Sequence, residues 1–171
     1  MKAILVSQHG GPDVLEWRDH QVGEPGTGEV RIRHEAVGLN FLDVYFRSGL
    51  YPAPNGLPLV PGNEGAGVVT SVGEGVTLFK TGDRVAYAGP IGAYAQERLI
   101  AAEKLVKVPD GIELDVAASM MLKGMTAEYL LRRTYDVKPG DTILYHAAAG
   151  GVGLIVGQWA KALGATVIGT V

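Results

Sequence analysis

The 171-residue sequence contains no cysteine, few aromatic residues, no long apolar run and no cluster of positive charge. Without cysteine the chain can form no disulfide, no thiolate nucleophile and no metal site that uses thiolate ligands. Its formal net charge of −3, with Lys and Arg scattered, offers no basic surface to nucleic acid or to an anionic membrane. No segment has the pattern of a signal peptide or the length of a transmembrane helix, so we expect a cytoplasmic protein.

The residues that are present are those of a globular protein. Hydrophobic residues make up 47% of the chain and charged residues 19%, whereas disordered chains combine low hydrophobicity with high net charge. Twenty-five glycines exceed the usual share of roughly 7%, and they fall at separated turns without a period. Glycine therefore marks tight backbone geometry in this chain.

Residues 1–125 have the pattern of a β-rich domain. Residues 29–37 alternate apolar and charged side chains, which is the period of a half-buried strand. Further strands are expected at 2–7, 15–19, 65–72, 83–88, 93–100 and 105–108. Residues 40–48 predict a short helix closed by Gly49, because Asp43 and Arg47 stand four apart. Short strands at close spacing indicate a small, mostly antiparallel barrel or sandwich.

Residues 126–171 have a different character, and we place a domain boundary before them. Helical spacing at 116–122 and 126–134 leads to a strand at 142–146, a glycine-rich turn, a helix at 152–163 and a second strand at 165–171. This order is one βαβ unit. Such a unit cannot cover both faces of its own sheet, so we expect the parallel domain to continue beyond Val171.

The strongest chemical signal is the turn from Ala148 to Gly153, which fits the dinucleotide-binding fingerprint with alanine in place of the first glycine. The pattern gains weight because a strand precedes it and a helix follows it. Gly150, Gly151 and Val152 would offer a diphosphate the N–H groups of a helix N-terminus, with no side chain in the way. The alternative is a tight turn without a ligand. His146, beside this turn, is better explained as a hydrogen-bonded structural residue than as an acid or base.

Several longer runs resemble one known family over essentially all of the chain. The runs are Gly140–Gly153 with Gln158 and Lys161, Gly38–Tyr45, Pro61–Gly67, Gly82–Val85 and Gly92–Tyr94. Together they resemble the zinc-independent quinone oxidoreductases, or ζ-crystallin-like proteins, of the medium-chain dehydrogenase/reductase superfamily. The resemblance implies a GroES-like catalytic domain followed by the first βαβ unit of a Rossmann domain, that is, about the first half of such an enzyme.

The same resemblance implies a function and a set of site residues. The expected reaction is hydride transfer from NADPH to a small-molecule quinone by an enzyme that is a homodimer when full length. Asn40 and Tyr45 are expected at the nicotinamide and quinone site, and Thr126 is expected to contact the cofactor. Alternatively, Tyr45 packs in the core and Asn40 and Thr126 each cap a helix. NADPH rests on the resemblance alone, because the residues that distinguish NAD from NADP lie at or past Val171.

The resemblance also implies that no zinc is bound. In zinc-containing relatives cysteine stands at the position of Asn40 and histidine at that of Asn63, and amides do not replace these ligands. We interpret Asn63 as a loop residue and Glu64 as a structural carboxylate. Reduction of a ketone leaves an alkoxide with a conjugate-acid pKa of ~16, whereas a quinone leaves a phenolate-like oxygen near ~10. This difference, on the order of 8 kcal/mol, makes a metal dispensable for a quinone.

Two other functions fit the same sequence. A zinc-free enoyl or alkenal reductase would share both domains, and its enolate product also needs less acid help than an alkoxide. A non-catalytic, crystallin-like protein that binds NADPH is the third possibility. For residues 1–171 alone we expect weak or absent turnover, because the nicotinamide half of the Rossmann site is missing.

Overall fold

The computed structural model describes all 171 residues, and these divide into two compact units, Met1–Met121 and Leu122–Val171. The sequence interpretation places the domain boundary after residue 125. No helix in either unit combines the length and the apolar character that crossing a membrane requires.

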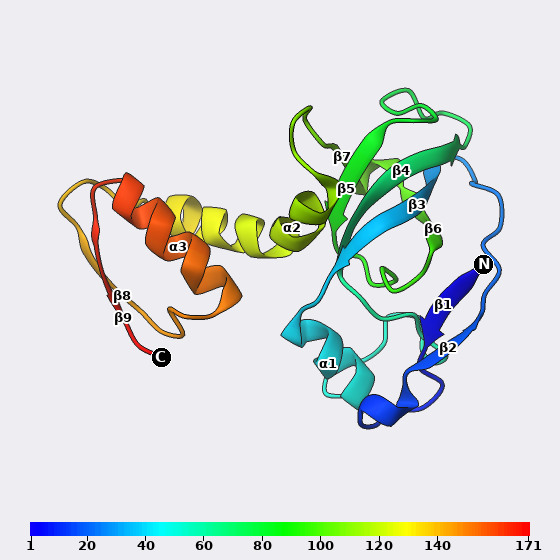
Figure 1. Cartoon of the computed structure of the whole chain (residues 1–171), viewed down its shortest axis with the longest axis horizontal. Helices are drawn as coiled ribbons and strands as arrows, with labels where there is room; N and C mark the ends of the chain where they lie inside the picture. Colours follow the sequence, from blue (N-terminus) through cyan, green and yellow to red (C-terminus); the bar gives the residue numbers. More distant parts are fainter. The chain divides into compact units, whose positions relative to one another are not determined.

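The first unit consists of two antiparallel sheets and a short helix (Figure 1). The small sheet pairs β1 (Lys2–Leu5) with β2 (Glu16–Asp19). The large sheet has the order β6-β3-β4-β5-β7. Its strands are β3 (Glu29–Gly38), β4 (Glu64–Val72), β5 (Arg84–Ala88), β6 (Glu97–Ala101) and β7 (Val106–Lys107). Every pairing is antiparallel, as the sequence pattern predicts.

The core of the first unit lies against the large sheet and follows from strand alternation. Val30 and Ile32 are fully buried, whereas Arg31 and Arg33 between and beyond them keep contact with solvent. Burial of such aliphatic side chains contributes roughly 1.5–3 kcal/mol each. The predicted strand at 93–100 is shorter in the structure, where β6 begins only at Glu97. The preceding backbone turns instead to bond the loop before β4, through the Tyr94 N–H and the Pro61 carbonyl.

Helix α1 (Phe41–Ser48) follows β3 and ends as the sequence predicts, with Gly49 in the left-handed conformation at φ 81°. The spacing of Asp43 and Arg47 is not used for an ion pair between them. The Asp43 side chain is buried, and the Arg47 side chain donates to the Gly10 carbonyl at 3.2 Å. Burial of the carboxylate therefore removes it from the surface row on which such pairs form.

Helix α2 (Leu114–Glu128) corrects the expectation of two separate helical segments. The helix runs through Gly124 without a break and continues into a π-helical turn, η3 (Tyr129–Thr134). Glycine inside a helix costs about 1 kcal/mol relative to alanine, which is not enough to end a helix when the residues on both sides favour it. Thr126 consequently lies within the helix, and the interpretation of Thr126 as an N-cap is wrong.

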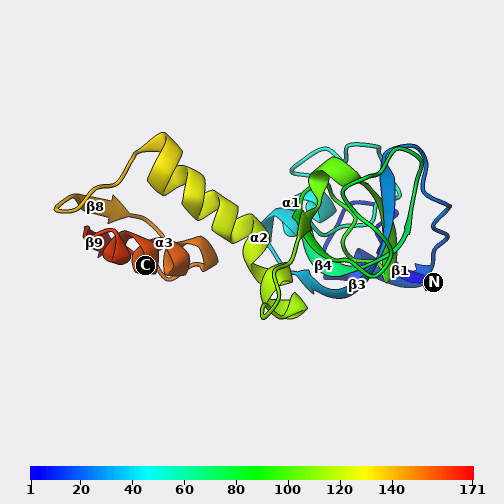
Figure 2. The ribbon, with the colours of Figure 1, turned by 90° about the horizontal axis from the view of Figure 1, so that it is seen from above.

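The second unit contains the predicted βαβ arrangement. Strands β8 (Thr142–Tyr145) and β9 (Thr166–Gly169) pair in parallel, and α3 (Gly151–Ala162) connects them. Figure 2 shows α3 lying along this two-stranded sheet. Val156 and Ala160 of α3 are fully buried, and Ile143 and Val167 of the strands pack against their cluster. The helical period of α3 therefore turns one apolar side toward the strands.

Candidate functional site

The buried polar side chains of the first unit form one cluster. Only three polar or charged residues of the chain are classed as buried, namely Asp43, Asn63 and Glu64. All three are hydrogen-bonded in the same network as Asn40. Buried polar groups cost free energy unless they are paired, so a network of this kind holds its members in fixed positions.

The strand register explains why this cluster forms. Gly38, the last residue of β3, pairs with Glu64, the first residue of β4. A side chain at Gly38 would collide with the Glu64 carboxyl group, so only glycine leaves this space open. Two residues later the chain reaches Asn40, whose Nδ2 donates to Glu64 Oε1 at 2.8 Å. Backbone pairing between distant parts of the chain thus brings the Asn40 amide and the Glu64 carboxylate together.

Asp43 is the acceptor for three donors. Its Oδ1 accepts from the Asn63 Nδ2 at 2.6 Å, and its Oδ2 accepts from the Tyr94 hydroxyl at 2.8 Å and from the Asn40 backbone N–H at 3.0 Å. The last bond caps the N-terminus of α1, where a carboxylate is favoured by the free N–H groups and by the helix dipole. Burial and the hydrogen bond to Asp43 raise the pKa of Tyr94, so this phenol stays protonated and acts as a donor.

Asn40, which the sequence interpretation expects at the site, belongs to this network and also begins helix α1. Its backbone is extended at φ −135°, as an N-cap residue requires. Carboxylates accept hydrogen bonds only, which fixes the Asn40 and Asn63 amides with their nitrogens toward Glu64 and Asp43. These nitrogens are donors rather than metal ligands. No group of three or more His, Cys, Asp or Glu side chains is arranged to hold a metal ion.

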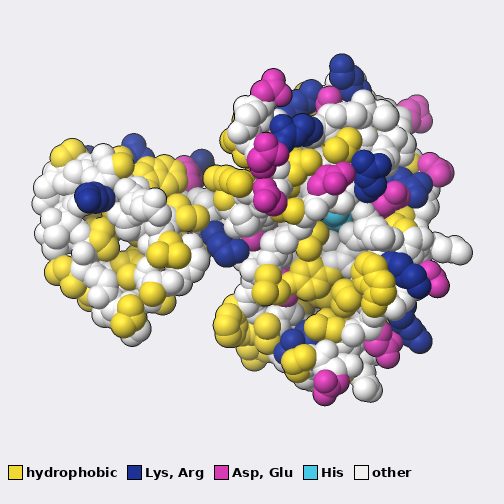
Figure 3. Space-filling model, viewed as in Figure 1, with side chains coloured by type: hydrophobic (Ala, Val, Ile, Leu, Met, Phe, Trp, Pro, Cys, Tyr) yellow, Lys and Arg dark blue, Asp and Glu magenta, His cyan; other side chains and the backbone are white.

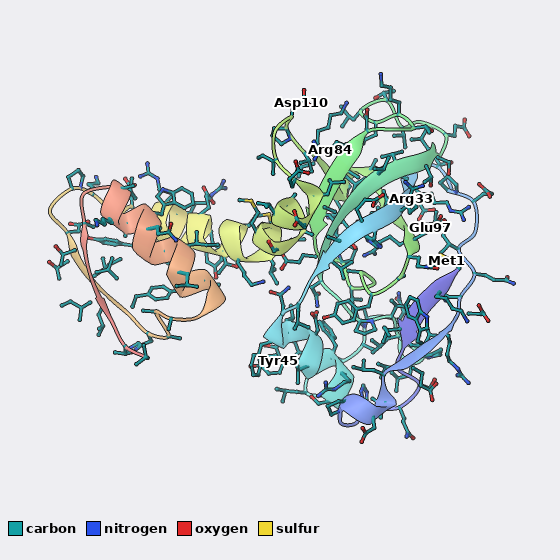
Figure 4. All side chains as sticks on the ribbon, viewed as in Figure 1. Met1, Arg33, Tyr45, Arg84, Glu97 and Asp110 are labelled. Carbon is teal, nitrogen blue, oxygen red and sulfur yellow. The ribbon has the colours of Figure 1, made fainter.

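Tyr45 lies on α1 (Figure 4), whose N-cap is Asn40. Its ring is half-buried between Phe41 and Tyr51, with ring centroids 6.0 Å and 5.4 Å away. These contacts fix the ring and leave its hydroxyl without a hydrogen-bond partner within the chain. The surroundings of Tyr45 are compatible with both hypotheses. Its ring packs among aromatic neighbours, as a core residue would, and its hydroxyl is available, as a site residue requires.

An apolar hollow of about 440 Å³ adjoins the polar cluster within the first unit. Trp17, Val37 and Leu39 line it together with Tyr94, which belongs to the cluster as well. Figure 3 shows hydrophobic side chains gathered on the face that α1 and β1 border. The Tyr94 hydroxyl is directed to Asp43, so the phenol joins an apolar surface to the buried polar network.

A second hydrogen-bonded group, only partly buried, lies within the first unit around His34. Its Nδ1 bonds to the Ala95 carbonyl at 2.6 Å, and its Nε2 bonds to the Tyr87 hydroxyl at 2.8 Å. Arg98 also donates to the Tyr87 hydroxyl oxygen, at 3.2 Å. Burial lowers the pKa of His34 to about 4, so its imidazole is neutral near pH 7. The sequence interpretation did not single out any of these residues.

The glycine-rich turn of the second unit leads into a helix that has no side-chain cap. It joins β8 to α3, and Gly150 stands at the N-cap in extended conformation without a side-chain capping bond. The first N–H groups of a helix have no acceptor within the helix, and here these belong to Gly151, Val152 and Gly153. A Cβ on Gly153 would lie 2.5 Å from the Ala148 carbonyl oxygen, so this glycine lets the helix pack against the turn.

Thr126 and His146, both of which the sequence interpretation considers, lie in the second unit. Thr126 donates its hydroxyl to the Leu122 carbonyl at 2.7 Å, a bond within α2. His146 lies beside the turn, where its Nδ1 is 3.0 Å from the Thr170 hydroxyl. The hydrogen bond expected for His146 is therefore present, and its structural role stays a prediction. Gly150, Gly151 and Val152 lie together at the start of α3, whereas Asn40 and Tyr45 belong to the first unit.

The sequence interpretation undervalued Asn63 and Asp43. Asn63 lies in a loop, as expected, but it is buried and donates to Asp43. Glu64 is a structural carboxylate, as expected, and its partner is the candidate site residue Asn40. The available signal was the Asn-x-x-Asp spacing of Asn40 and Asp43, which is a variant of the capping box.

The chain is similar to known proteins in sequence and in fold. Residues 26–110 match the family model of the alcohol dehydrogenase GroES-like domain. A quinone oxidoreductase from Pseudomonas aeruginosa is 62% identical over 171 residues, which cover 99% of this chain and 52% of that protein. A 2-haloacrylate reductase from Burkholderia sp. is 55% identical, over 99% of this chain and 52% of its own.

Among solved structures, the Escherichia coli quinone oxidoreductase complexed with NADPH superposes with a TM-score of 0.97. It is 49% identical, and the match covers 100% of this chain and 52% of that one. The chain thus spans about half the length of the curated relatives it matches.

Proposed function

Because the chain belongs to the medium-chain dehydrogenase/reductase superfamily, as its GroES-like domain and its quinone oxidoreductase relatives establish, we propose that the full-length protein is an NADPH:quinone oxidoreductase. The reaction is hydride transfer from the nicotinamide to a quinone without zinc. Residues 1–125 are the GroES-like catalytic domain in this proposal, and residues 126–171 begin the Rossmann domain. The observation that carries it is the uncapped, glycine-rich start of α3, combined with relatives that are quinone oxidoreductases.

The cofactor assignment is supported by the second unit. A diphosphate at the start of α3 would accept hydrogen bonds from the N–H groups of Gly151 and Val152 and would lie at the positive end of the helix dipole. Gly150 places no side chain at this N-terminus, and Gly153 lets α3 pack closely against the turn. The choice of NADPH is supported by the E. coli relative, whose crystal structure contains NADPH. When bound, this cofactor supplies the hydride.

The metal-free chemistry is supported by the donors of the first unit. Asn40 and Asn63 are held with their nitrogens toward carboxylates, which is unlike the thiolate and imidazole set of a catalytic zinc site. Hydrogen-bond donors in a site that excludes water stabilise a developing phenolate-like oxygen. We assign that role to the Asn40 amide and the Tyr45 hydroxyl as positioning and hydrogen-bonding groups. Thr126 completes the proposed set as a cofactor contact.

The test is a steady-state comparison on the full-length protein. With NADPH as donor, kcat/KM for a panel of para- and ortho-quinones should exceed kcat/KM for conjugated enones and 2-haloacrylates. Retention of activity after dialysis against a chelator is part of the same expectation. A protein that binds NADPH tightly but oxidises it with no quinone would contradict the proposal and favour a non-catalytic role.

A second candidate, a zinc-free enoyl or alkenal reductase, is supported by one comparison. The 2-haloacrylate reductase relative is 55% identical to this chain, and its named substrate is a conjugated acid with a polarised double bond. Hydride addition to such a substrate gives an enolate, which the same donors would stabilise. A kcat/KM ratio in favour of 2-haloacrylate over every quinone would select this candidate.

By family resemblance we expect a homodimer of the full-length protein in the cytoplasm, with a small-molecule quinone as its partner. Sedimentation velocity of the full-length protein measures its mass in solution. A species with the mass of one chain at micromolar concentration would contradict the homodimer.

A further inference from the structure

The hydrogen bonds around Asp43 form a closed ring that fixes Asn40 from two sides. On one side, Asp43 Oδ2 accepts the Asn40 backbone N–H at 3.0 Å. On the other, Asp43 Oδ1 accepts the Asn63 Nδ2 at 2.6 Å. The next residue after Asn63 is Glu64, whose Oε1 accepts the Asn40 Nδ2 at 2.8 Å. The ring therefore runs from the Asn40 backbone through Asp43, Asn63 and Glu64 back to the Asn40 side chain.

We propose that Asp43 is the positioning residue of the quinone site, because it alone joins both sides of this ring. It touches neither substrate nor cofactor in this assignment, and it acts by setting where the Asn40 amide lies. The inference rests on the proposed function, in which Asn40 is a hydrogen-bonding group for the reaction.

The chemistry of a carboxylate is essential to this role. The three partners of Asp43 are an amide N–H, a phenol O–H and a backbone N–H, and all of them donate. Only a side chain with two acceptor oxygens satisfies them together. Asparagine has nearly the same shape but would turn a donor toward one of these partners, which breaks the ring while conserving volume.

Asp43→Asn in the full-length protein tests the inference, with NADPH and 1,4-benzoquinone as substrates. We expect kcat to fall on the order of 100-fold, the loss that a displacement of about 1 Å in a positioned group produces. KM for NADPH should stay within about threefold, because the diphosphate contacts lie in the second unit. A merely structural role would lower the midpoint of thermal unfolding without this separation of kcat from KM.

A matched control is Asp83→Asn. Asp83 also accepts a backbone N–H, from Lys80 at 3.2 Å, and a side-chain ammonium, from Lys107 at 3.0 Å, but it lies outside the ring. We expect this variant to lose some thermal stability and to keep kcat. A loss of kcat that follows thermal stability equally in both variants would overturn the inference.

A rescue variant separates the links of the ring. Asp43→Asn combined with Asn63→Asp exchanges donor and acceptor across the 2.6 Å contact and restores that bond. We expect the double variant to recover about tenfold of the lost kcat, a coupling that a double-mutant cycle measures. A double variant no better than Asp43→Asn would overturn the inference.

If Asp43→Asn does not fold, Asn63→Ala opens the same ring at its next link while leaving two donors on Asp43. It should lower kcat in the same direction, and unchanged kcat would overturn the inference. The outcomes also separate this inference from the proposed function. An active wild-type protein with an unaffected Asp43→Asn variant contradicts only the inference, whereas a wild-type protein without quinone-dependent NADPH oxidation contradicts both.

Discussion

The two proposed sites differ in the chemical groups that form them, which are side chains in the first unit and backbone N–H groups in the second. In the first unit the site consists of side chains, and its order depends on which of them donate and which accept, as at Asp43. In the second unit the site consists of backbone N–H groups, and its order depends on the absence of side chains, as at Gly153. Substitutions that keep the size of a side chain but exchange donor for acceptor should therefore disturb the first site. Substitutions that enlarge a side chain should disturb the second.

The largest expected effect is a change in the free energy of unfolding with pH, which arises from His34 in the first unit. His34 has a pKa of about 4 in the folded chain, below its ordinary 6.5, because it is buried. The unfolded state therefore binds the extra proton between these values. This contribution to stability is fully present above pH 6.5 and is lost as pH falls toward 4, by about 3 kcal/mol. Denaturant unfolding between pH 7 and pH 4 measures it.

His34→Gln is the control for this prediction, since glutamine does not titrate. It should flatten the pH dependence of the free energy of unfolding, whatever its own stability at pH 7. A slope that persists in His34→Gln would contradict the assignment.

The next prediction tests whether a larger side chain in the glycine-rich turn of the second unit weakens NADPH binding. In Gly153→Ala the new Cβ would meet the carbonyl oxygens of Ala148 and Ala147 at 2.5 Å and 2.6 Å, so α3 must move away from the turn. We expect the Kd of the full-length protein for NADPH to rise about 100-fold. Gly157→Ala on the same helix has no atom within 4 Å of its Cβ and should leave this Kd unchanged. Fluorescence titration with NADPH compares the two variants.

A smaller effect is expected when the Tyr45 hydroxyl of the first unit is removed and the size of the side chain is nearly kept. Tyr45→Phe keeps the ring between Phe41 and Tyr51 and removes only the hydroxyl. If the hydroxyl stabilises the developing oxyanion, kcat/KM for the quinone falls by up to about tenfold, the worth of one neutral hydrogen bond. The Kd for NADPH provides the internal control and should not change by that amount. Unchanged kcat/KM would assign Tyr45 to packing alone.

The smallest effect comes from Val152, which we assign to the site through its backbone N–H. Val152→Ala keeps that N–H and shortens only the side chain. The Kd for NADPH should change less than about threefold, in contrast to Gly153→Ala. A large loss of affinity in Val152→Ala, measured by the same titration, would show that the side chain rather than the backbone contacts the cofactor.

The difference between the units also explains how much the sequence could predict. The turn of the second unit is local, so its strand, glycines and helix are adjacent in the chain and the fingerprint from Ala148 to Gly153 reveals them together. In the first unit, the antiparallel strands follow from alternation and the helix stop from Gly49. The partners of Asp43 do not follow from either pattern, because they depend on the register that pairs Gly38 with Glu64.

The continuity of α2 and the burial of Asn63 could not be predicted from the sequence, for energetic reasons. The gap expected between the helical segments at 116–122 and 126–134 contains Gly124, but the cost of about 1 kcal/mol for glycine within a helix is too small to end α2 there. The burial of Asn63 was missed because asparagine in a glycine-rich loop is usually exposed. Only a carboxylate placed within reach by another element makes that burial favourable.

The most direct measurement is the rate of quinone-dependent NADPH oxidation by the full-length protein before and after exhaustive dialysis against a zinc chelator. The account predicts the same kcat in both samples, because amide and hydroxyl donors stabilise the reduced oxygen. Loss of activity on dialysis, with recovery on addition of zinc, would contradict it.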